Sequence, residues 1–165
     1  MARTSNFKNR LTSALRAALD ELRQRIGSER LYGFVLYTSG EDDFVYVSAS
    51  ANTEEALGDD RDLRWSVADW KYHDFSKTIG SLELPDGEGE ARDQRVYRDM
   101  IAALKTLDEE HRFGQGAARE QIVLNVVCGD MSEEFFTAGL RQLNPVTVVD
   151  AWLEAKTTWP QRPPS

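Results

Sequence analysis

Residues 31–57, LYGFVLYTSGEDDFVYVSASANTEEAL, decide the fold that we expect for this chain. Two apolar runs of strand length, Leu31–Thr38 and Phe44–Ser50, flank a polar loop that contains a glycine and has the length of a hairpin connection. In Leu31–Thr38 both faces of the pleated strand would be apolar, a pattern typical of a strand that is covered on both sides. The stretch therefore predicts a hairpin at the centre of the protein.

A helix is expected directly after the second strand. Asn52 is an N-cap residue type, and Glu55 follows three positions later, which is the capping-box pattern. Apolar residues that recur every three to four positions predict longer helices at about 4–25 and 91–111. The remaining predicted elements are short helices after Ser66 and at Phe75–Leu84, a strand at Gln121–Cys128, and helices that begin at Ser132 and Pro145.

The order of these elements, α-β-β-α-α-α-β-α-α, predicts one α+β domain that spans residues 1–156. We expect a small, mainly antiparallel sheet of three or more strands, packed by the first, the long and the last helices. A chain of 165 residues is long enough to bury a core of this kind. Residues 157–165 hold three prolines, and we expect them to form a loosely ordered tail.

The composition is acidic, with 28 aspartates and glutamates against 20 lysines and arginines and a formal net charge of −8. This balance argues against nucleic acid or an anionic membrane as the partner, because both are polyanions. It fits a basic protein partner, and it equally fits a charge that serves only solubility. The single cysteine, Cys128, excludes an internal disulfide and fits a reducing compartment. With no apolar stretch of signal-peptide or membrane-span length, we expect a soluble, cytoplasmic protein.

No group of residues in the sequence identifies a reaction, and we expect no cofactor. Cys128 falls on a predicted buried strand, where a thiol is normally an inert, small apolar group. The weak candidates for a metal site are Asp69, His73 and Asp74, since a helix would present Asp69 and His73 together. A transition metal usually needs three or four protein ligands, so a half-exposed histidine in a polar turn is the simpler interpretation.

Paired acidic residues are abundant in predicted loops and first helical turns, where carboxylates are normally solvated. Their positions after strands and at helix starts would gather them at one edge of the sheet and form an acidic binding surface. Trp65 and Trp70 are expected either to plug the end of the sheet or to anchor an interface. The candidate partner-binding residues are Glu41, Asp42, Asp43, Glu54, Glu55, Asp59, Asp60, Asp62, Trp65 and Trp70.

Two motifs occur in order along the chain: ANTEEAL at Ala51–Leu57, and RWS-x-x-DW at residues 64–70. Together with Leu143-Asn144-Pro145 before the last helix, they resemble the bacterial family catalogued as domain of unknown function 4303. The resemblance extends from Leu15 to Ala155. Domains of this kind look like those encoded beside polymorphic toxins of bacterial competition, where small acidic α/β proteins neutralise a cognate toxin. The resemblance implies such a role, and it provides no catalytic residue.

Our leading hypothesis is a non-enzymatic protein-binding domain, an immunity protein that occludes a basic toxin domain through its acidic surface. One alternative is a hydrolase of unknown substrate, with either a metal at Asp69, His73 and Asp74 or carboxylates in a cleft near Trp65. Another alternative is a structural or regulatory module that self-associates through an exposed aromatic patch. The sequence leaves the oligomeric state open.

Overall fold

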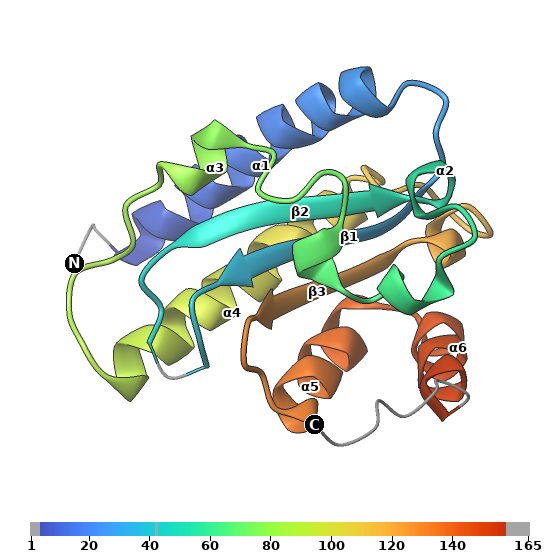
Figure 1. Cartoon of the computed structure of the whole chain (residues 1–165). Coiled ribbons are helices and arrows are strands. Elements are labelled where there is room, and N and C mark those ends of the chain that lie inside the picture. The colour runs from blue at the N-terminus through green and yellow to red at the C-terminus, as the bar shows by residue number, and fades with distance from the viewer. Residues whose placement is uncertain (1–3, 42, 158–165) are drawn as a thin grey trace.

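The computed structural model describes residues 4–41 and 43–157, so Asp42 and the predicted tail from residue 158 onward lie outside the described residues. The short helix expected after Ser66 is a single 3₁₀ turn, Val67–Asp69, and with this exception the order of helices and strands is the predicted one. The α+β fold is confirmed (Figure 1). The elements are α1 Thr4–Ile26, β1 Leu31–Thr38, β2 Val47–Thr53, α2 Glu54–Leu57, α3 Lys77–Gly80, α4 Glu90–Glu109, β3 Val123–Cys128, α5 Glu133–Leu143 and α6 Val146–Thr157. In the described part of the chain, no helix is long and apolar enough to cross a membrane.

The three strands form one sheet in the order β2-β1-β3. The hairpin strands β1 and β2 pair antiparallel, as expected, whereas β3 joins the other side of β1 in parallel. The parallel pairing follows from the connection, because the chain returns through the long helix α4 before it enters β3. The carboxyl ends of β1 and β3 therefore lie at the same end of the sheet.

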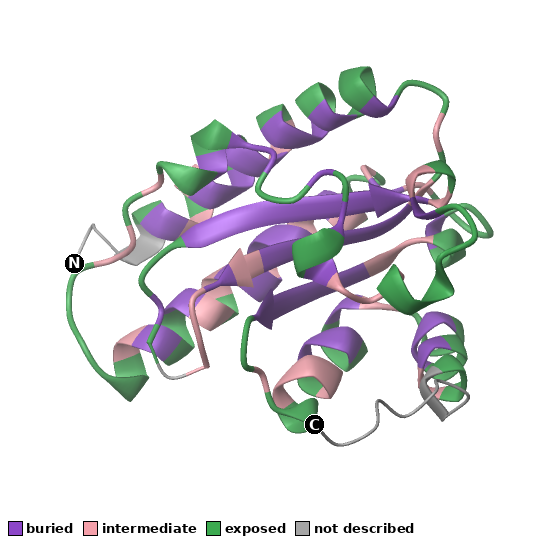
Figure 2. Ribbon diagram, in the orientation of Figure 1, coloured by how far each residue is buried: buried purple, intermediate pink, exposed green. Residues whose placement is uncertain are grey.

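Each face of the sheet packs against a different layer. One face carries Phe34 and Leu36 of β1, and it packs in the largest apolar cluster, which α1 and α4 complete. The chain segment between α2 and α3 lies over the other face (Figure 1). There Val35 and Val127 contact Val67 and Trp70 of that segment. Burial is nearly continuous along the strands, which agrees with the two-sided apolar pattern (Figure 2).

Trp70 lies directly against the backbone of β1. A Cβ atom at Gly33 would lie 2.7 Å from the indole of Trp70, so only glycine permits this approach. Trp70 is 4% exposed, and its Nε1 donates a hydrogen bond to the carbonyl of Arg64 at 3.0 Å. Of the two roles expected for this tryptophan, the structure supports packing.

The boundaries of the hairpin differ from those expected. The second strand runs from Val47 to Thr53, not from Phe44 to Ser50. Residues 44–46 belong to the loop, where Ser39 Oγ accepts a hydrogen bond from the Val45 N–H at 2.9 Å and holds the connection closed. Apolar side chains there had the appearance of a strand, but two of the three are exposed.

Three further boundaries are corrected. Thr53 is the N-cap of α2 and accepts the Ala56 N–H at 3.1 Å, whereas Asn52 lies one residue earlier, inside β2. The helix expected at Phe75–Leu84 is only the single turn α3, which begins after the N-cap Ser76. The third strand starts two residues later than expected because 119–121 form a 3₁₀ turn.

Each outer strand of the sheet forms hydrogen bonds at its edge with another part of the same chain. On the β2 side, Ala51 exchanges two backbone hydrogen bonds with Tyr72, and the Phe75 N–H donates to the Ala49 carbonyl. On the β3 side, Asn144 accepts the Leu124 N–H at 2.9 Å and donates to the Leu124 carbonyl at 2.7 Å. The side chain of Asn144 thus replaces a neighbouring strand at this position.

Candidate functional site

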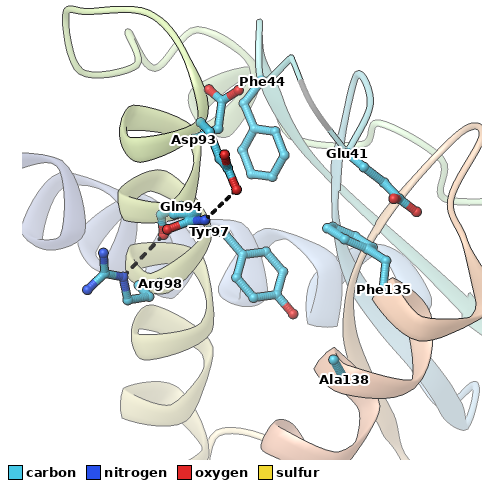
Figure 3. Close-up of a pocket in the computed structure, with 9 residues that line it drawn as sticks. Glu41, Phe44, Asp93, Gln94, Tyr97, Arg98, Phe135 and Ala138 are labelled. Atoms are coloured by element: carbon cyan, nitrogen blue, oxygen red, sulfur yellow. Dashed lines mark hydrogen bonds between the residues drawn. The ribbon is translucent and has the colours of Figure 1, made fainter.

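A pocket of about 560 Å³ opens at the carboxyl ends of β1 and β3, where open sheets of α/β proteins commonly bind ligands. Its walls come from the β1–β2 loop, the first half of α4, and α5 (Figure 3). The lining residues are Glu41, Phe44, Glu90, Asp93, Gln94, Tyr97, Arg98, Phe135 and Ala138.

Aromatic rings form the inner part of the pocket. The rings of Tyr97 and Phe135 lie with their centroids 5.3 Å apart and their planes tilted by 56°. Phe44, 2% exposed, closes the side formed by the loop. Burial raises the pKa of the Tyr97 hydroxyl, so this group stays protonated near neutral pH.

Three carboxylates and one guanidinium surround these rings. Glu41 accepts the backbone N–H of Ser132 at the start of α5, and Glu90 accepts the side-chain amide of Gln94 at 3.0 Å. Neither glutamate is ion-paired with a described residue. The third carboxylate, Asp93, is 6% exposed and is matched by Arg92 at 2.8 Å. Arg98, the guanidinium of the lining, donates to the Gln94 carbonyl at 3.4 Å and points away from the rings (Figure 3), so Glu41 and Glu90 are the carboxylates that give the pocket its negative charge.

The tip of the hairpin presents exposed apolar groups, and one of them, Val45, lies in a groove beside this pocket. Val45 and Tyr46 are 64% and 42% exposed, which is unusual for side chains of this size. A second groove, which shares Phe44 and Asp93 with the pocket, connects it to Val45 and to the acidic residues Asp43 and Glu88. We call the exposed residues of this region the hairpin face: Asp43, Val45, Tyr46, Glu88 and Glu90.

The predicted acidic surface is divided between the two ends of the sheet. Glu41 and Asp43 lie in the β1–β2 loop, whereas Glu54, Glu55 and the acids of residues 59–62 follow the far end of β2. Because β1 and β2 are antiparallel, these positions are at opposite ends, and the expectation of a single acidic edge is wrong. Asp42 is outside the described residues.

The acids also differ in what they contact. Glu54 pairs with Arg64 at 2.8 Å, and Glu55 pairs with Arg30 at 2.9 Å, so both are used within the domain. By contrast, four of the predicted residues are exposed and have no ion pair among the described residues. These four are Asp43, Asp59, Asp60 and Asp62.

The two family motifs meet around Tyr32 and Arg64. The Arg64 guanidinium lies 4.3 Å from the centroid of the Tyr32 ring, while the Tyr32 hydroxyl donates to the Arg64 carbonyl at 2.9 Å. Asn52 of ANTEEAL donates to the same hydroxyl at 2.9 Å. Trp65 is half-buried, with its ring edge-on to Tyr32 and to Trp152. These contacts join the sheet, α2 and the following segment, which is a structural role.

The hydrogen bonds from Arg64 lower the pKa of Glu54 below its usual value of 4.5. A carboxylate of this kind stabilises the folded state above its unfolded pKa, and the stabilisation is lost as the pH falls through its lower folded pKa. We expect Glu54→Gln to be less stable than the native protein at pH 7 and equally stable in acid. Urea unfolding at a series of pH values measures this, and a difference that persists below the folded pKa of Glu54 would contradict it.

The weak metal candidates do not converge. Asp69 accepts the Ser66 hydroxyl at 2.5 Å, His73 Nδ1 lies 3.1 Å from Ser50 Oγ, and the Asp74 N–H donates to the same Oγ at 3.0 Å. Among the described residues, no three histidine, cysteine, aspartate or glutamate side chains are placed to hold a metal. Ser50 is fully buried, so its contact with His73 is not an accessible nucleophile–base pair.

Comparison with known proteins gives the family. The model of Domain of unknown function (DUF4303) matches residues 11–145 of the chain. The chain belongs to this family. The match includes the hairpin, α4 and α5, so the pocket and the hairpin face lie within the DUF4303 domain. No curated protein and no solved structure matched the chain.

Proposed function

We propose that this DUF4303 domain is a protein-binding domain of the immunity type, which neutralises a cognate bacterial toxin by covering it with the hairpin face. The observation that carries the proposal is the exposure of Val45 and Tyr46 at the hairpin tip, with Val45 in a groove that also holds Asp43 and Glu88 and adjoins an apolar pocket. An apolar centre with a polar rim is the usual anatomy of a protein interface. Tyrosine in particular is enriched among residues that contribute most binding energy.

Charge supports the choice of a basic partner. The chain carries a formal net charge of −8, Asp43 and Glu88 line the same groove as Val45, and Glu90 lines the adjoining pocket. Negative potential at the interface accelerates association with a basic protein, and salt screens the effect. The acids of residues 59–62 lie at the other end of the sheet, where they add to the overall field without reaching the hairpin face.

The resemblance to domains encoded beside polymorphic toxins supports the immunity role. Co-expression with the toxin encoded next to the domain tests it. We expect the domain to restore growth and to co-purify with the toxin as a stable complex. A neighbouring gene product that is not toxic, or one that forms no complex with the domain, would contradict the proposal.

Substitutions then locate the interface on the isolated complex. We expect Tyr46→Ala to raise the dissociation constant about tenfold or more, as for a central interface aromatic. The matched control is Val146→Ala, since Val146 is 74% exposed on α6, away from the hairpin.

The double substitution Asp43→Lys, Glu88→Lys is expected to slow association more than Asp59→Lys, Asp62→Lys. If Asp59→Lys, Asp62→Lys slows association more, the interface lies at the α2 end of the sheet and not at the hairpin face. If light scattering of the isolated domain shows dimers, self-association is favoured over the immunity role.

A further inference from the structure

We infer that the pocket between α4 and α5 receives an arginine side chain of the protein partner. The inference deepens the proposed function and rests on it, because the arginine belongs to a protein that docks on the hairpin face. The pocket and the hairpin face adjoin through the shared residues Phe44 and Asp93. A side chain that projects from a partner seated on Val45 would therefore be close to the pocket.

Aromatic rings make the interior suitable for an organic cation. Tyr97 and Phe135 stand at an angle of 56°, and Figure 3 shows them on opposite walls, on α4 and α5, with Phe44 above them. The faces of aromatic rings attract cations, most strongly where water is displaced. The apolar stem of the same cation would be covered by these rings and by the small side chain of Ala138.

The carboxylates determine the sign of the charge that is accepted. Glu90 and Glu41 stand on opposite sides of the pocket, on α4 and on the loop, and neither is ion-paired with a described residue. Arg92 already balances Asp93 and donates to the carbonyls of Phe44 and Pro85, so it is not available to neutralise the glutamates. Arg98 is exposed at the rim. Three carboxylates against Arg98 leave the lining of the pocket negative, so an anionic ligand is disfavoured.

Guanidinium fits this combination better than ammonium does. It is planar, so it stacks on an aromatic face, and its fork of N–H donors can bind carboxylates from two directions at once. It is also more weakly hydrated than the lysine ammonium, which lowers the cost of entering a partly apolar pocket. The inference therefore concerns arginine in particular.

The test uses short peptides on the isolated, ¹⁵N-labelled domain. We compare acetyl-Gly-Arg-Gly-amide with the same peptide carrying citrulline, which keeps the shape and removes the charge. We expect the arginine peptide alone to shift the amide resonances of the β1–β2 loop, the first half of α4, and α5, with a dissociation constant on the order of millimolar. Equal shifts with citrulline, shifts centred elsewhere, or no shifts would each overturn the inference.

Variants separate pocket binding from general attraction to an acidic protein. Ala138→Leu fills the pocket without a charge change, and we expect it to abolish the arginine-specific shifts while leaving helical signals intact. Glu90→Gln should weaken peptide binding about two- to fivefold, the range of one exposed ion pair. Its matched control is Glu109→Gln, the same substitution at the opposite end of α4, which should bind the peptide as the native domain does.

The two proposals fail in different ways. If Ala138→Leu binds the toxin as tightly as the native domain while Tyr46→Ala does not, the pocket inference is overturned and the immunity proposal stands. If the arginine peptide binds the pocket but the adjacent toxin forms no complex, the proposed function fails.

Discussion

Replacement of Arg119 with methionine is expected to lower the free energy of unfolding by about 3 kcal/mol, the cost of breaking a buried ion pair from one side. Arg119 is 6% exposed and joins three parts of the chain. Its guanidinium contacts Asp108 of α4 at 2.7 Å, the Ile122 carbonyl before β3 at 2.7 Å, and the Leu143 carbonyl at the end of α5 at 2.8 Å. Methionine keeps much of the volume but leaves these acceptors without a donor.

Urea unfolding followed by circular dichroism measures the Arg119→Met effect. The control is Arg95→Met, the same substitution at an exposed position of α4, where we expect a change within about 0.5 kcal/mol. Equal changes in the two variants would show that Arg119 contributes no more than a surface arginine does.

Gly139→Ala is expected to destabilise the fold by about 2 kcal/mol, although alanine is normally the better helix former. A Cβ atom at this position of α5 would lie 2.2 Å from Asn125 Oδ1. The Asn125 side chain cannot easily yield, because it accepts the Val126 N–H at 2.8 Å and donates to the Phe136 carbonyl at 3.1 Å. The methyl group would therefore separate α5 from β3 or break these bonds.

Gly80→Ala is the matched control for the substitution in α5. Gly80 also lies in a helix, but the nearest atom to an added Cβ is Asp74 Oδ1 at 3.7 Å, an ordinary contact. We expect Gly80→Ala to be neutral or to stabilise by up to about 1 kcal/mol, because alanine restricts the unfolded chain. Thermal unfolding of both variants compares them, and a Gly139→Ala protein as stable as Gly80→Ala would contradict the packing argument.

The order of the elements could be predicted because it depends on local patterns. Two-sided apolarity in residues 31–38 requires a covered strand, and Ser132 is a recognisable N-cap that accepts the Phe135 N–H as expected. The strand boundaries could not be read in the same way. Phe44 and Val45 have strand propensity, but Phe44 is buried in the loop while Val45 is exposed, and tertiary contacts decide this.

The candidate site was harder to predict from the sequence, because tertiary contacts also decide which of its residues come together. Tyr97 and Phe135 each belong to the apolar side of a separate helix, and only the packing of α4 beside α5 brings them together. Glu90 and Glu41 are 49 positions apart and resemble many other acids in the chain. The division of the acids between the two ends follows from strand direction, whereas the sequence shows only that they follow strands.

The hydrogen bonds at the two outer edges of the sheet have a consequence for how a partner can bind. A domain with an open edge can capture an extended peptide by β-augmentation, and it also risks edge-to-edge aggregation. Here Tyr72 pairs with Ala51 of β2, and Asn144 bonds to the N–H and carbonyl of Leu124 in β3. At these positions a partner cannot add a strand by main-chain pairing, which favours recognition through side chains, and Asn144→Ala would free the N–H and carbonyl of Leu124 for pairing with a foreign strand.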